Sequence, residues 1–96
     1  MAGYAHIITL GEAIDSAGIR APEYQFTYND GNNSYARTFD ETGLIEFLTE
    51  DIALTPEALN MVLAQLRDKG NANVADLHIP PRETSVLGLK EVPSDY

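Results

Sequence analysis

Cysteine is absent from this sequence of 96 residues, and no apolar run is longer than a few residues. The first absence excludes disulfide bonds, thiolate metal sites and cysteine nucleophiles, and it is typical of a reducing compartment. The second, together with the lack of a basic segment after Met1, predicts neither a signal peptide nor a membrane span. We therefore expect a soluble, cytoplasmic protein.

Basic residues are also scarce: 6 Lys and Arg stand against 15 Asp and Glu, which gives a net charge of −9. Proteins that bind nucleic acid directly neutralise its phosphates with clustered Lys and Arg, and membrane-surface helices carry a basic face. Neither kind of partner is expected here. The chain is 44% hydrophobic, which is enough for a core, and its length suits one domain.

Aromatic residues alternate with other residues in the middle of the chain, a pattern that predicts a β-hairpin. Every second position carries a large side chain, in two sets: Tyr24, Phe26 and Tyr28, then Tyr35, Arg37 and Phe39. Residues 29–33, Asn-Asp-Gly-Asn-Asn, favour a tight turn between the two strands. We expect the aromatic side chains to face one another across the hairpin and to fill a core beneath helices.

Residues 10–17 carry a helical pattern that follows a short first strand at residues 4–8. Thr9 and Glu12 have the spacing of a capping box. The apolar positions recur at the interval of one helix face and are Leu10, Ala13, Ile14 and Ala17. Gly18 stands where a left-handed C-cap is expected, so the pattern predicts a short helix that ends there.

Two further helices and a last strand are predicted after the hairpin. Asp40 suits the N-cap of the first helix, and Thr55 with Pro56 suits the start of the second, which Gly70 ends. The buried face of the second helix is expected to be Leu59, Val62, Leu63 and Leu66. Residues 74–79 read as the last strand, with Ala75, Leu77 and Ile79 on one face.

The expected fold is therefore a small single α+β domain of order β-α-β-β-α-α-β. Its mostly antiparallel sheet contains the hairpin, and the helices pack on one face. The domain covers residues 1–79. Residues 80–96 contain three of the five prolines and form a mobile or loosely docked tail, which Val86, Leu87 and Leu89 could anchor.

Two local patterns are weak candidates for chemistry. His6 and His78 both fall in expected strands, where a pair of imidazoles would suit proton transfer or a metal, but neither has a neighbouring ligand apart from Asp76. The calcium-loop spacing is met by Asp30, Asn32, Ser34 and Glu41, but Tyr35 stands where that loop needs glycine. A hairpin turn explains the same residues with fewer conflicts.

No nucleophile elbow, P-loop or dinucleotide fingerprint occurs. We therefore predict no catalytic residue, no bound metal and no cofactor, and a protein that is not an enzyme. An active site assembled from distant residues stays possible as an alternative.

The charge distribution is the one feature that points to a function. Residues 38–66 contain no Lys or Arg, and their six acids are Asp40, Glu41, Glu46, Glu50, Asp51 and Glu57. Charge runs of this kind usually form a solvated, solubilising face. They also suit an electrostatic docking face for a basic protein, because opposite charges steer association. We take these six residues as the candidate partner-binding site.

The leading hypothesis is a non-enzymatic interaction module, that is, a regulator, adaptor or accessory subunit that binds a basic protein. One alternative is an acidic inhibitor that imitates nucleic acid and blocks a phosphate-binding groove. Another is a small enzyme that uses a histidine and carboxylates. A mimic needs a continuous acidic stripe, an adaptor an apolar patch with an acidic rim, and an enzyme a pocket that holds a histidine beside an acid.

Overall fold

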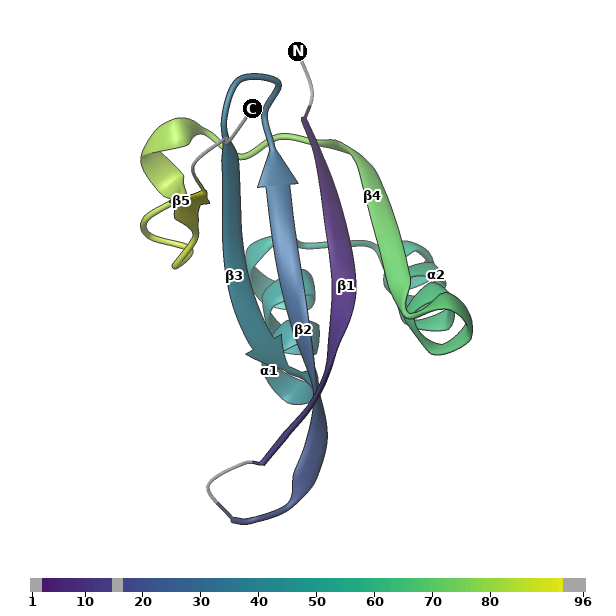
Figure 1. Ribbon diagram of the computed structural model, residues 1–96. Helices are drawn as coiled ribbons and strands as arrows, with labels where there is room; N and C mark the ends of the chain where they lie inside the picture. Colours follow the sequence, from purple (N-terminus) through teal and green to yellow (C-terminus); the bar gives the residue numbers. More distant parts are fainter. Residues whose placement is uncertain (1–2, 15–16, 93–96) are drawn as a thin grey trace.

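A computed structural model describes residues 3–14 and 17–92, which form a small α+β domain. Its five-stranded sheet has the order β4-β1-β2-β3-β5, and every neighbouring pair of strands is antiparallel. The helices lie on one face of this sheet, behind it in Figure 1, and none of the described residues covers the other face, which we call the open face. The predicted fold class is confirmed.

The strands are β1 (Gly3–Ile14), β2 (Arg20–Asn29), β3 (Ser34–Asp40), β4 (Asn71–Leu77) and β5 (Lys90–Val92). The helices are α1 (Glu41–Glu46), the π-helical turn η1 (Phe47–Asp51), α2 (Pro56–Lys69) and the 3₁₀ turn η2 (Pro81–Glu83). None of the helices in the described ranges is long and apolar enough to cross a lipid bilayer.

The predicted aromatic hairpin is confirmed as β2 and β3. The register pairs Tyr24 with Phe39 and Tyr28 with Tyr35, so these side chains share one face of the sheet. The rings of Tyr28 and Tyr35 stack with their centroids 6.5 Å apart. Asp30 holds the turn, because its carboxylate accepts hydrogen bonds from the backbone N–H groups of Asn32 and Asn33.

The core lies between this face and the helices. Phe26 and Tyr28 are fully buried, and Phe47 of η1 meets the ring of Phe26 edge-on at a centroid distance of 5.0 Å. Leu44 and Leu48 fill the space beneath α1 and η1. The aromatic residues of the hairpin are therefore core residues, as predicted.

The two helices that the caps predict are present. The Asp40 carboxylate accepts a hydrogen bond from Gly43 N, and the Thr55 hydroxyl accepts one from Ala58 N. Gly70 ends α2 in the left-handed region with φ 78°. Val62 and Leu66 of α2 are buried as expected, whereas Leu59 and Leu63 are only half-buried.

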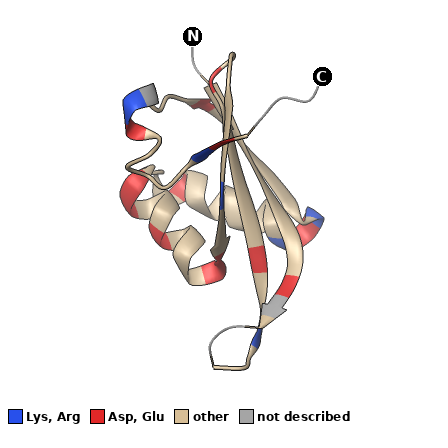
Figure 2. Ribbon diagram, turned by 60° about the vertical axis from the view of Figure 1, so that its left-hand side comes forward, with Lys and Arg blue, Asp and Glu red and all other residues tan. Residues whose placement is uncertain are grey.

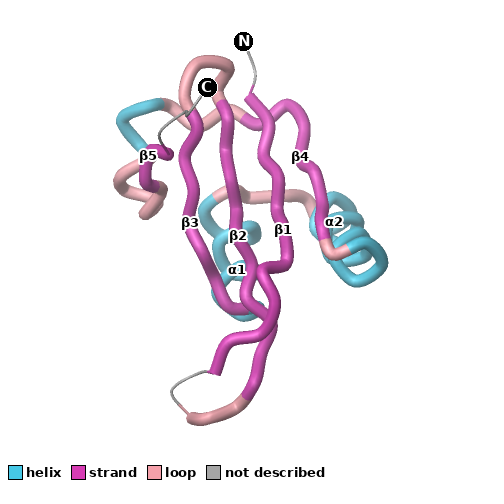
Figure 3. The backbone as a smooth tube through the Cα atoms, viewed as in Figure 1, coloured by secondary structure: helices cyan, strands magenta, loops and turns pink. Residues whose placement is uncertain are grey.

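The predicted helix at residues 10–17 is wrong, because β1 continues to Ile14 and pairs there with Arg20 of β2. The part of the prediction at residues 15–16 lies outside the described residues. Gly11, with φ 112°, forms a bulge where the register shifts, and this bulge occupies the place of the expected capping box. Pairing with β2 overrides the helical spacing, since isolated short helices are weak. Figure 3 shows β1 and β2 continuing as a two-stranded ribbon below the rest of the sheet.

The last predicted strand is present but begins earlier, as β4. The predicted face of Ala75, Leu77 and Ile79 is not uniform: Ala75 is exposed, Leu77 half-buried and Ile79 buried, whereas Ala72 and Val74 turn toward the core in the first half of the strand. A register shift between Gly3 and Ala5 of β1 and a left-handed Asp76, with φ 56°, mark a bulge in β4. The bulge changes the alternation of side chains, so Ile79 reaches the core from beyond the strand.

Residues 80–92 lie against β3 and add β5, a strand that the sequence did not predict. Leu89 is buried and Leu87 half-buried, but Val86 is 81% exposed, so only the first two serve as anchors. The Arg37 guanidinium donates a hydrogen bond of 2.7 Å to Leu87 O. The described part of the predicted tail is therefore docked on the sheet, and whether it is mobile stays a prediction.

Ala53, between η1 and α2, has a left-handed backbone with φ 59°. A residue with a Cβ atom costs about 1–2 kcal/mol in this backbone conformation because of steric clashes. Glycine has no such clash, and it only loses somewhat more conformational entropy than alanine when the chain folds. Ala53→Gly is expected to raise the free energy of unfolding by about 0.5–1 kcal/mol. Urea denaturation of both proteins measures the change, and a destabilised variant would contradict it.

Candidate functional site

The six predicted site residues are all exposed and lie in the helical layer. We call them the acidic surface: Asp40, Glu41, Glu46, Glu50, Asp51 and Glu57. The structure brings five of them onto the continuous segment formed by the Asp40 cap, α1 and η1, and Glu57 lies in the first turn of α2. Figure 2 shows acidic positions distributed along this layer.

The open face of the sheet has a different character. Between the pairs Tyr4–Asn29 and Ile8–Gln25, the register places a mixture of amide, hydroxyl, imidazole and apolar side chains there. They include His6, Thr27, Ala36 and Asn73. Within the described residues, this central area has no acid, and Lys90 joins it opposite Ala36. The negative charge of the fold is therefore concentrated on the helical side and at the sheet ends.

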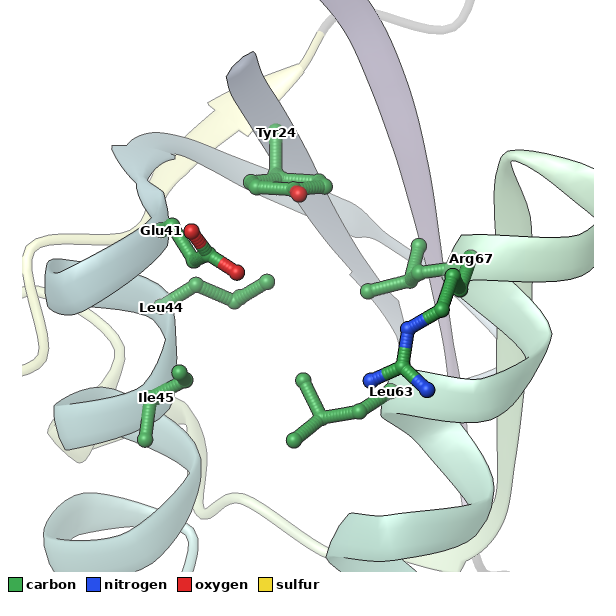
Figure 4. A pocket seen from close by; sticks show the side chains of 7 residues that line it. Tyr24, Glu41, Leu44, Ile45, Leu63 and Arg67 are labelled. Carbon is green, nitrogen blue, oxygen red and sulfur yellow. The ribbon is translucent and has the colours of Figure 1, made fainter. Parts of the chain in front are cut away.

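A cavity of about 130 Å³ opens between α1 and α2 at the edge of the acidic surface. Its apolar walls are Leu44 and Ile45 of α1 and Leu63 and Leu66 of α2. Its polar groups are Tyr24, Glu41 and Arg67. Figure 4 shows Glu41 and Arg67 on opposite sides, with the Tyr24 ring above them. One acceptor, one cation and one hydroxyl therefore surround an apolar space.

The pKa of Tyr24 is raised above the ordinary 10.0, first because burial disfavours the phenolate and second because Glu41 is negative. The neutral phenol therefore contributes stability that is present below the pKa of the unfolded chain and is lost as pH rises through the raised value.

We expect Glu41→Gln to lower the pKa of Tyr24 without returning it to its ordinary value, because the larger cause, burial, remains. Titration of the Tyr24 ring carbon by NMR between pH 8 and about 12 measures the change. Glu46→Gln is a matched control, since it removes one charge from the same helix outside this cavity. An unchanged Tyr24 titration in Glu41→Gln would show that the two groups do not interact.

The other sequence candidates are not assembled into sites. His6 pairs in register with Thr27 and Asn73, and His78 follows the end of β4. Neither histidine lines the cavity between α1 and α2. Asp30 lies in the β2–β3 turn, whereas Glu41 follows the far end of β3, so the calcium-loop set is split. In residues 3–14 and 17–92, no group of three His, Asp or Glu side chains is placed to hold a metal ion.

Sequence reasoning missed Tyr24 and Arg67 as members of one site. In the sequence, Arg67 indicates only a favourable cation near the end of a helix, and Tyr24 only one position of the alternating aromatic pattern. They are far apart in the chain and meet because α1 and α2 cover different strands of one sheet. No local spacing carries that information.

Comparisons of the chain with protein-family models, with curated proteins and with solved structures give no match. The functional argument therefore depends on the geometry and charge described above.

Proposed function

We propose that the chain is a non-enzymatic protein-interaction module, a regulator, adaptor or accessory subunit, whose acidic surface docks a basic partner. The observation that supports this proposal is the separation of charge. Six exposed carboxylates lie in the helical layer without a Lys or Arg in residues 38–66, and the central open face of the sheet has no acid in its described part. Such a distribution steers a cationic partner toward one side. A cytoplasmic location fits the cysteine-free composition.

Asp40 and Glu41 have further roles that separate them from the rest of the surface. Asp40 caps α1, so its replacement would disturb folding, and Glu41 acts on Tyr24. Glu46 and Glu50 are exposed and have neither role. They are therefore the residues with which to test docking without changing the fold.

The test compares the wild type with the double variant Glu46→Gln/Glu50→Gln as baits in extracts of the native host. Partners retained by the wild type are identified by mass spectrometry, and their association rates are then measured against ionic strength. We expect the double variant to slow association by a factor of about 3–10 at low salt, with a smaller effect at physiological salt. Its stability should barely change, since both side chains are solvated.

The matched control is Glu83→Gln/Glu91→Gln, which removes the same charge from exposed positions in the C-terminal segment. It should associate with the partner nearly as the wild type does. Equal rates and equal salt dependence for all three proteins would contradict the proposal. If a duplex DNA fragment competes with the chain for the same partner, the alternative of a nucleic-acid mimic is favoured.

A further inference from the structure

The two edges of the sheet differ in their protection against pairing. The β5 edge has three residues, of which Lys90 and Glu91 are charged, and both features discourage another strand from adding. The β4 edge begins with Asn71, Ala72, Asn73 and Val74, which include no charge and no proline. Its only protection within the strand is the bulge at Asp76, near the far end.

The backbone of this unprotected edge points hydrogen-bonding groups outward. Thr9 N donates to Gly70 O at 2.8 Å, so the alternation of an antiparallel pair directs the N–H and C=O groups of Asn71 and Asn73 away from β1. The Asn73 N–H donates a hydrogen bond of 3.3 Å to the side-chain oxygen of Gln65 in α2. The side-chain amide of the half-buried Gln65 thus occupies the position that the carbonyl group of a further strand would take.

A groove of about 180 Å³ runs beside this edge, between β4 and α2, with apolar side chains at most of its lining positions and the amides of Gln65 and Asn73 at the others. Leu54, Ala58 and Val62 line it from the helical side, and Val74 and Ala75 from the strand. Met61, in the same groove, is 62% exposed, which is unusual for a large apolar side chain on an otherwise amphipathic helix. Figure 1 shows α2 and β4 together at one side of the molecule, away from α1.

The charges around the groove suit a second copy in the opposite orientation. Glu57 and Asp76 lie at the end where α2 begins and β4 finishes, and Lys69 lies at the other end, beside Gly70. A two-fold axis through the edge brings the acidic end of one copy toward the Lys69 end of the other. Asp68 on the helix flank offsets part of this attraction. Most of the acidic surface is on α1 and η1, which cover the other half of the sheet, so it stays outside the contact.

We propose that two copies of this chain associate through their β4 edges, antiparallel, so that the two sheets become one and the two α2 helices cover the joined apolar grooves. Asn71 and Asn73 supply the backbone hydrogen bonds, and Met61 supplies buried apolar area. This association goes beyond the proposed docking function and shares only Glu57 with the acidic surface. The variants that test the two proposals lie at different residues, so either proposal can fail without the other.

Sedimentation equilibrium of the full chain, from about 1 to 500 µM, tests the proposal. We expect a mass that approaches twice the 10.5 kDa of one chain as concentration rises. Met61→Lys introduces a charge in the groove, and Asn73→Pro removes the outward N–H group; each should raise the dissociation constant by a factor of about 10 or more. Circular dichroism confirms that each variant is folded.

Val86→Lys is the matched control for Met61→Lys, because it places the same charge at another exposed apolar residue, 81% exposed against 62% for Met61, that lies outside the groove. It should dimerise as the wild type does. A wild type that remains monomeric over the whole concentration range would overturn the proposal. In that case a strand from another protein becomes the candidate occupant of the groove. A dimer that both folded variants retain would also overturn it, since the contact would then lie elsewhere.

Discussion

Replacing Phe26 with alanine is expected to lower the free energy of unfolding by about 3–5 kcal/mol. Phe26 is 0% exposed and lies in the middle of the sheet, where its ring packs edge-on against Phe47. Alanine leaves a cavity between sheet and helix and removes that ring contact. Because domains of this size are stable by only about 5–15 kcal/mol, the variant should be partly unfolded near physiological temperature.

Urea denaturation at 25 °C followed by circular dichroism measures this loss. Phe26→Leu is the graded control, since leucine refills most of the space and should cost less than about 2 kcal/mol. A loss below about 1 kcal/mol for Phe26→Ala would mean that the helices do not cover this part of the sheet.

Removal of residues 81–96 is expected to cost about 2–4 kcal/mol, the second-largest effect. The truncation deletes Leu89, which is 4% exposed, and the strand β5 that pairs with β3. It also uncovers the end of the sheet near Tyr35 and removes the carbonyl group that Arg37 binds. The sequence alone predicts a mobile or loosely docked tail at residues 80–96. That prediction implies the opposite result, in which deletion of the residues after Pro81 leaves the secondary structure intact.

Thermal and urea unfolding of the truncated chain decide between these two expectations. Leu89→Ala should reproduce most of the loss, whereas Val86→Ala, at an 81% exposed position of the same segment, should stay within about 0.5 kcal/mol of the full chain. A truncated chain as stable as the full one would show that the docked segment adds nothing to the core.

Secondary-structure elements could be predicted from the sequence where their local residue patterns are strong. The hairpin has alternation and a dense turn, and α2 has Thr55 at one end and Gly70 at the other. The incorrectly predicted helix at residues 10–17 also had capping residues, Thr9 and Gly18, but it is short, and pairing with Arg20 and Ala21 of β2 overrides these signals. β5 has three residues and no pattern of its own, so only its pairing with β3 defines it.

Some features of the candidate site could also be predicted from the sequence, and others could not. Exposure of the acids could be predicted because polar helix positions follow from the apolar stripe. The grouping of Tyr24, Glu41 and Arg67 required the packing of two helices on one sheet. The open β4 edge also depended on strand order, since β4 returns beside β1 and leaves its other side unpaired in the described structure.

The strand order has a consequence for how the chain folds. β1, β2 and β3 are consecutive neighbours, so their pairing closes short loops and is fast. β4 can pair with β1 only after the residues of α1 and α2 have been synthesised, and the β1–β4 contact closes a much longer loop. Until then, the edge of β1 with Ile7 and Ile8 has no partner. We expect β1, β2 and β3 to pair first and β4 to dock late. Aggregation during synthesis should therefore depend on the unpaired edge of β1.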